Sequence, residues 1–157
     1  LFIPEEDYGF YSLSALATII FCERGLPFLY QGQEIGMSNR QWKYDEFNDL
    51  ETINQYQIAL KAGMSKEQAL EIARHHSRDN ARTPMQWSSE ENAGFSKGKP
   101  WMPVNENYKV VNVAEEEKEY GSILNFYKRL IAFYKSEEYN NRRKIKSRKY
   151  GHTPRFV

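Results

Sequence analysis

The chain has 157 residues, of which 40% are hydrophobic and 27% are charged, and this composition is typical of a globular domain. Its net charge of +1 is unevenly spread, because seven of the 22 Lys and Arg residues, and no acid, lie in 141–157. The first 140 residues therefore hold 15 basic and 21 acidic side chains, a balance of −6 that argues against a nucleic-acid-binding body.

The cysteine count and the hydropathy exclude two further classes. Cys22 is the only cysteine, so no intramolecular disulfide is possible, nothing indicates an oxidising compartment, and we expect a cytoplasmic protein. The longest apolar run, 15–22, is far too short to cross a bilayer. The chain begins at Leu1 without a Met or a visible signal peptide, and we expect it to be a fragment.

The first predicted elements are a helix and a buried strand. Apolar side chains at helical spacing predict a helix over about 8–24, closed by Gly25. The apolar run 26–30 then lies between turn residues and predicts a strand buried on both faces, as parallel barrel strands are. Pro27 falls at the start of that strand, where no ladder donor is lost.

Two helices are predicted after a polar stretch. Asn48 as the cap and Glu51 three residues later form a capping-box pattern for a helix that Gly63 ends. Ser65 and Gln68 repeat the pattern and open a helix that runs to about residue 75.

A loop and a final helix complete the chain. The stretch 77–113 is interrupted by Pro and Gly and is predicted to be a loop. Ser122 is expected to cap a long helix whose apolar face carries Leu124, Tyr127, Ile131 and Tyr134. The order of helix, strand, long polar excursion and helix predicts a βα unit with an elaborate loop where (β/α)₈ barrels place their active sites.

Two stretches carry a resemblance to a known family: 25–37 (GLPFLYQGQEIGM), and 77–87 (SRDNARTPMQW) followed by 92–95 (NAGF). They resemble the eighth strand and its following loop in the α-amylase superfamily of glycoside hydrolases (family 13). The second stretch is most similar to the branch of oligo-1,6-glucosidases, dextran glucosidases, isomaltases and trehalose-6-phosphate hydrolases. The resemblance covers about 8–139.

The resemblance implies an α/β fold, namely a partial (β/α)₈ TIM barrel made of the seventh helix, the eighth strand with a long helical loop, and the eighth helix. Residues 1–140 would be the C-terminal part of the catalytic barrel. Because a single strand has two unpaired edges, we expect the isolated segment to be marginally stable. For the basic stretch 141–157 we expect a disordered tail or a segment foreign to the family rather than a nucleic-acid-binding arm.

The resemblance also implies a retaining α-glucosidase, in which one carboxylate attacks the anomeric carbon and a carboxylic acid protonates the leaving oxygen. The family supplies these groups from earlier strands. No Asn-His-Asp segment is present, and His75, His76 and His152 do not match the family's histidine. We therefore assign no catalytic residue, expect the isolated chain to be inactive, and expect a missing N-terminal barrel segment as its partner.

Two residues are candidates for substrate binding. The resemblance assigns Arg78 to the non-reducing end of the cleaved glucose, where its planar donor fork would bridge a sugar hydroxyl and an upstream Asp. The structural alternative is an ion pair with Asp79 or a barrel acid. Glu51 falls where the family has an acid near the leaving-group side, and the alternative is its capping-box role.

The neighbours of Arg78 are assigned structural roles. Asp79 and Asn80 are expected to shape the turn by bonding nearby backbone. For Arg82 a structural role is favoured, and Trp87 either walls the pocket or lies buried beneath the loop.

No cofactor or metal is expected, since Gly32 and Gly36 lack the spacing and the Lys of a phosphate loop and no metal-ligand cluster is visible. The expected ligand is an α-linked gluco-oligosaccharide, with the linkage left open between 1,6, 1,4 and trehalose-6-phosphate. The competing hypothesis is a non-catalytic relative, such as the glucosidase-like heavy chain of an amino-acid transporter.

Overall fold

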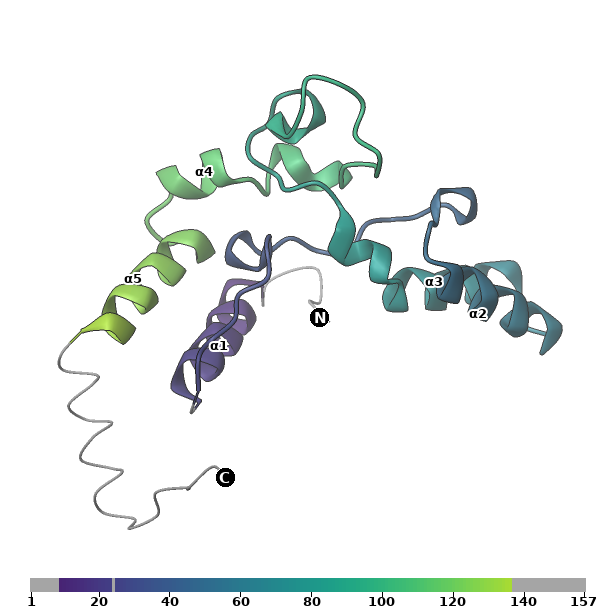
Figure 1. The fold of residues 1–157 in the computed structure, drawn as a ribbon, viewed down its shortest axis with the longest axis horizontal. Coiled ribbons are helices and arrows are strands. Elements are labelled where there is room, and N and C mark those ends of the chain that lie inside the picture. Colours follow the sequence, from purple (N-terminus) through teal and green to yellow (C-terminus); the bar gives the residue numbers. More distant parts are fainter. Residues whose placement is uncertain (1–8, 24, 137–157) are drawn as a thin grey trace, which may run out of the picture.

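The computed structural model describes residues 9–23 and 25–136 and consists there of helices joined by irregular segments (Figure 1). Helix α1 (Gly9–Cys22) packs on α5 (Ile123–Lys135), and α2 (Leu50–Lys61) packs on α3 (Lys66–His76) on the other side of the molecule. The short helix α4 (Val113–Lys118) contacts α5. Short 3₁₀ turns in the connecting segments include Gln33–Ile35, Tyr44–Glu46, Arg78–Arg82, Glu91–Gly94 and Glu106–Lys109.

Each helix pair has its own apolar cluster. Between α1 and α5 the buried members are Ala17, Phe21, Ile123 and Tyr127. The α2–α3 pair shares its cluster with the segments before α2 and before the Glu106–Lys109 turn, and the buried members are Trp42, Phe47, Tyr56, Ala69, Ala73 and Met102. The amphipathic pattern of α5 is confirmed, because Tyr127, Ile131 and Tyr134 of its predicted apolar face pack against α1. Leu124, the fourth predicted member, packs with Ile35 and Met85.

Two predicted helix starts are confirmed by their side-chain caps. At α3 the Ser65 hydroxyl oxygen accepts from the Gln68 backbone N–H at 3.2 Å, and the Gln68 side-chain oxygen accepts from the Ser65 N–H at 3.1 Å. At α5 the Ser122 hydroxyl oxygen accepts from the Asn125 N–H at 3.2 Å. Each cap satisfies a backbone donor that a helix start otherwise leaves without an intrahelical partner.

The predicted start of α2 is wrong by one residue. The N-cap is Asp49, and its carboxylate makes no capping bond because it is engaged by Arg78 and Thr52. Glu51 is the second residue of the helix, so the capping box expected between Asn48 and Glu51 is absent. Glu51 instead accepts from the side-chain amide of Gln55, one turn further along the helix, at 3.4 Å.

The predicted strand at 26–30 is not confirmed, since the described residues 9–23 and 25–136 contain no strand. The segment is irregular, and the Phe28 side chain is 81% exposed. A strand exists only through ladder hydrogen bonds to a neighbouring strand, and the described part of the chain supplies none. The burial expected on both faces therefore does not occur.

The remaining differences concern boundaries and one missed helix. Helix α1 ends at Cys22, two residues before the predicted end. Helix α4, which was not predicted, begins at the last residue of the predicted loop 77–113. Its cap is Asn112, whose side-chain oxygen accepts from the Glu115 N–H at 3.0 Å. The basic stretch 141–157 lies outside the described residues, so the proposed division at residue 140 stays a prediction.

A buried arginine fixes the segment that leads into α2. The Arg40 guanidinium donates to the Glu46 carboxylate at 2.6 and 3.2 Å and to the Val104 carbonyl at 3.2 Å, and it pairs with Glu106 at 2.7 Å. These contacts hold the segment before α2 against the segment that ends in the Glu106–Lys109 turn.

Candidate functional site

The 3₁₀ turn Arg78–Arg82 follows α3 directly and carries the predicted substrate-binding arginine. Ser77 ends the helix, and its hydroxyl oxygen accepts from the Asp79 N–H at 3.2 Å. The tight turn sends consecutive side chains in different directions: Arg78 is exposed, whereas Asp79 is completely buried. One short element thus presents a cation to solvent and a carboxylate to the interior.

Arg78 forms a two-point ion pair with Asp49. Its Nη2 lies 2.6 Å from Oδ1 of Asp49, and its Nε lies 3.3 Å from Oδ2. The Asp49 side chain is only 3% exposed and also accepts from the Thr52 hydroxyl at 2.8 Å. An ion pair of Arg78 with Asp79 was one expected alternative, and the observed partner is instead Asp49.

The ion pair shifts the pKa of both partners. Hydrogen bonding from the Arg78 guanidinium holds the pKa of the Asp49 carboxyl well below its usual range, against the raising effect of burial, and the Thr52 hydroxyl adds to the lowering. The same hydrogen bonds raise the pKa of Arg78. The pair is therefore fully charged at neutral pH.

Glu51 lies beside this pair. Its Oε2 is 3.6 Å from Nη2 of Arg78, and both side chains are well exposed, at 64% and 60%. Among the described residues nothing forms a hydrogen bond with Nη1 of Arg78. The structure thus brings the two predicted substrate-binding residues together, with the Asp49 side of the guanidinium occupied and the opposite side open to solvent.

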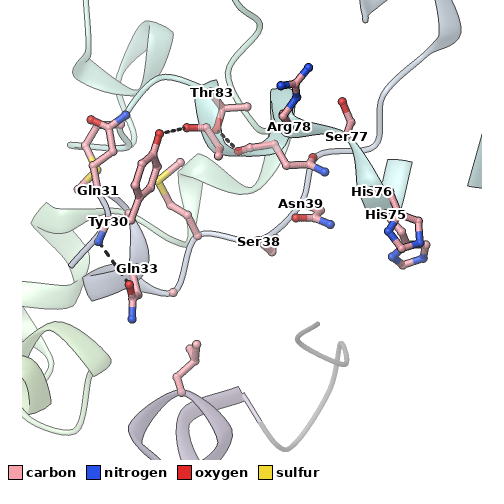
Figure 2. A pocket seen from close by; sticks show the side chains of 17 residues that line it. Tyr30, Gln31, Gln33, Ser38, Asn39, His75, His76, Ser77, Arg78 and Thr83 are labelled. Carbon is pink, nitrogen blue, oxygen red and sulfur yellow. Dashed lines mark hydrogen bonds between the residues drawn. The ribbon is translucent and has the colours of Figure 1, made fainter. Parts of the chain in front are cut away.

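A pocket of about 460 Å³ adjoins the turn, and Arg78 is among its lining residues. Figure 2 shows Tyr30 on one side of the pocket and His75 and His76 on the other. The Tyr30 hydroxyl donates to the Ala81 carbonyl at 2.9 Å and so ties the segment after 26–30 to the turn. The volume lies within the range of small-molecule sites.

The neighbours of Arg78 only partly follow their predicted roles. Arg82 pairs with the buried Asp79 at 3.1 Å, which is the structural role that was favoured. Asp79 accepts from backbone N–H groups about 30 residues away, so the expectation of local bonding is wrong for Asp79. Trp87 is 51% exposed, so the buried alternative is wrong, and it does not line the pocket.

Sequence reasoning missed Asp49. Its partner Arg78 is 29 residues away, and no local pattern pointed to their contact. The only available signal was a second acid two residues before Glu51 at a predicted helix start.

The described residues show neither a metal centre nor a membrane span. No group of three or more His, Cys, Asp or Glu side chains within them is placed to hold a metal ion. No helix in that part of the chain is long and apolar enough to cross a membrane.

The comparisons with known proteins agree with the resemblance. The family model "Alpha amylase, catalytic domain" matches residues 4–142. The chain is 41% identical to the oligo-1,6-glucosidase of Parageobacillus thermoglucosidasius over 139 residues, which cover 87% of this chain and 25% of that protein. It is 40% identical to the glucan 1,6-alpha-glucosidase of Streptococcus pneumoniae, with 86% and 25% covered.

Solved structures of enzymes are also similar to this chain in both fold and sequence. The trehalose-6-phosphate hydrolase of Bacillus licheniformis superposes with a TM-score of 0.79 at 42% identity, covering 83% of this chain and 24% of that one. The isomaltulose synthase of Klebsiella sp. LX3 superposes with a TM-score of 0.72 at 42% identity, covering 78% and 22%. The chain spans about a quarter of the length of the curated relatives it matches.

Proposed function

The chain belongs to the α-amylase catalytic-domain family, and we propose that it forms the part of an α-glucosidase barrel that binds the terminal glucose of an α-linked gluco-oligosaccharide. In the completed enzyme the reaction is retaining hydrolysis of the oligo-1,6-glucosidase type. Arg78 binds the non-reducing end of the cleaved glucose, and Glu51 contacts the sugar on the leaving-group side. The cytoplasmic location expected from the single cysteine stays a prediction.

The observation that carries this proposal is the geometry of Arg78. A guanidinium offers five N–H donors in one plane, and here Asp49 binds Nε and Nη2 and leaves Nη1 for a ligand. Because the buried carboxylate already orients the fork, sugar binding does not have to order a free side chain. A charged donor at this position favours a terminal hydroxyl and supports cleavage at chain ends.

Glu51 supplies the complementary chemistry. Its exposed carboxylate accepts hydrogen bonds, and it lies within 3.6 Å of the cation that donates them. Sugar hydroxyls both donate and accept, so a carboxylate next to a guanidinium can bind neighbouring hydroxyls of one ligand. The pocket beside Arg78 offers the volume that a monosaccharide unit needs.

The reactive carboxylates are proposed to come from another part of the completed protein. Retaining hydrolysis needs a nucleophile and an acid roughly 5 Å apart, and no residue of this chain is assigned to either role. This chain then acts by holding the sugar at the reacting groups, an effect that can contribute several powers of ten to a rate. The transporter heavy-chain alternative is not favoured, because the matched relatives are named as glucosidases.

The test uses a completed chimera, in which the matching 139-residue segment of the Parageobacillus oligo-1,6-glucosidase is replaced by that of this chain. Arg78→Ala should raise KM for isomaltose and the inhibition constant of glucose by about 10- to 100-fold, the value of one or two charged hydrogen bonds. Arg78→Lys should recover little, because an ammonium group cannot bind Asp49 at two points and a hydroxyl at the same time.

The matched control is Arg129→Ala. Arg129 is an exposed arginine on α5 that donates to the Tyr120 carbonyl and lies over its ring, away from the site. Its removal should leave KM within about twofold of the parent. Unchanged KM and glucose inhibition in the Arg78→Ala chimera would refute the proposed role of Arg78.

A second test concerns the isolated 157-residue chain, which should release no glucose from isomaltose or from p-nitrophenyl α-glucoside. Adding the remaining part of the relative as a separate polypeptide is the positive control for assembly. Measurable turnover by the purified chain alone would contradict the assignment of both reactive carboxylates to another segment.

A further inference from the structure

Asp79 is a charged residue that is completely buried, and it does not line the pocket beside Arg78. We propose that Asp79 is a positioning residue for sugar binding, because its carboxylate holds the backbone of Asp49, and Asp49 in turn orients the Arg78 guanidinium. This inference rests on the proposed role of Arg78.

Three hydrogen bonds converge on the Asp79 carboxylate. Its Oδ2 accepts from the backbone N–H of Asn48 at 2.7 Å and from that of Asp49 at 2.9 Å. Its Oδ1 accepts from Nη1 of Arg82 at 3.1 Å. A buried charge is tolerated only when such bonds replace its hydration, so the carboxylate and the entry to α2 hold each other in place.

These bonds close a small ring of interactions. Arg78 and Asp79 are adjacent on one 3₁₀ turn, and both bind the same residue, Asp49. Asp79 holds the Asp49 backbone, while Arg78 holds the Asp49 carboxylate. Movement of the Asp49 backbone would shift the carboxylate that fixes the guanidinium, and errors of about 1 Å in a binding group are costly.

The next residue supplies a matched control. Asn80 holds a different loop, since its side-chain oxygen accepts from the Trp42 indole N–H at 2.7 Å and from the Arg40 N–H at 3.2 Å. Its contacts include neither Asp49 nor Arg78. A variant at Asn80 therefore disturbs the same turn without breaking the ring.

Asp79→Asn is the informative change in the completed chimera. An amide has one accepting oxygen and one donating nitrogen, whereas three donors converge on the Asp79 carboxylate. The amide N–H₂ must therefore face a donor, and the neutral amide oxygen binds the backbone N–H groups of Asn48 and Asp49 more weakly than the carboxylate does, so the entry to α2 is held less firmly. We expect KM for isomaltose and the glucose inhibition constant to rise about tenfold, with a smaller change in kcat.

A double-mutant cycle tells positioning from general destabilisation. If Asp79 acts through Arg78, adding Asp79→Asn to Arg78→Ala should raise KM no further. The effect of Asn80→Ala should instead add to that of Arg78→Ala. Independent addition of the Asp79 and Arg78 effects, or an unchanged KM in Asp79→Asn alone, would overturn the inference.

Arg82→Ala keeps the inference testable if Asp79→Asn does not fold. It removes the ion pair on Oδ1 and leaves both backbone bonds on Oδ2, so KM should change by less than about threefold. A rise as large as that of Arg78→Ala would contradict positioning through the backbone of Asp49. If Arg78→Ala itself does not change KM, the proposed function is refuted. If Arg78→Ala raises KM but Asp79→Asn does not, only the positioning role of Asp79 is refuted.

Discussion

Asp49 is an acid almost completely removed from solvent, and its oxygens are bound by the Arg78 guanidinium and the Thr52 hydroxyl. The hydrogen bonds from Arg78 lower the pKa of this carboxyl more than burial raises it. The folded chain therefore favours the ionised form of Asp49 more strongly than an unfolded chain does. Folding and the charge of this one side chain are consequently linked.

This linkage predicts an acid-sensitive contribution to stability. An unfolded Asp has a pKa of about 3.9, and that of folded Asp49 is lower, so the contribution is fully present above about pH 4. It should be lost as the pH falls from there through the lowered pKa of the folded state. Asp49→Asn should thus lower the urea midpoint of the completed chimera at pH 7, and the difference should shrink at the lowest accessible pH.

The pH series needs the parent chimera and Asp49→Asn measured side by side, because other acids also titrate below pH 5. Lys118→Ala provides a comparison, since its ion pair with Glu115 is exposed and should contribute little at any pH. A constant gap between the parent and Asp49→Asn from pH 7 to acid would contradict the lowered pKa.

At the scale of elements, one serine joins two helices. The Ser122 hydroxyl caps α5 by accepting from the Asn125 N–H at 3.2 Å, and it donates to the Glu116 carbonyl of α4 at 2.6 Å. The Asn125 side chain adds donations to the carbonyls of Glu116 and Glu119 at 3.1 and 2.8 Å. The angle between α4 and α5 is therefore held by hydrogen bonds at the junction.

Ser122→Ala should lower the free energy of unfolding of the completed chimera by about 1 kcal/mol, the usual effect of losing a serine N-cap. Urea unfolding followed by circular dichroism measures the change. Ser89→Ala, at an exposed loop position, is the control and should have an effect within about 0.5 kcal/mol of zero. Equal effects of the two substitutions would show that the cap at α5 adds nothing.

At the scale of the whole molecule, the segment 26–30 exposes apolar side chains that a stable domain would cover. Phe28 and Leu26 are 81% and 73% exposed, and Tyr30 is also exposed. The two helix pairs each bury a cluster of their own, but neither covers this segment. The chain spans about a quarter of its relatives, and we infer that other parts of a complete barrel cover 26–30.

Phe28→Asp should therefore act in opposite directions in the two contexts. In the isolated chain it removes exposed apolar surface, so binding of the dye ANS and aggregation should fall. In the completed chimera it places a charge in the segment that we infer to be covered, so the yield of soluble, active protein should drop severely. Lys97→Asp, at an exposed loop position, is the control and should change neither. A fully active Phe28→Asp chimera would show that the segment stays exposed.

Local patterns predicted a large part of the helical structure. The starts of α3 and α5 were predicted at Ser65 and Ser122, because a capping bond joins residues only three positions apart. The capping box predicted between Asn48 and Glu51 is absent because the Asn48 N–H, which Glu51 would bind, donates to Asp79 about 30 residues away. Helix α4 was missed because six residues carry too little periodicity to be recognised.

The sequence by itself determined the family, because contiguous motifs carry that information, and it named Arg78 and Glu51 as candidate residues. Only the tertiary structure decided which acid pairs with Arg78 and where the Asp79 carboxylate points, because those contacts join segments about 30 residues apart. The state of 26–30 was decided in the same way, since strand formation depends on a neighbour and not on the apolar run itself.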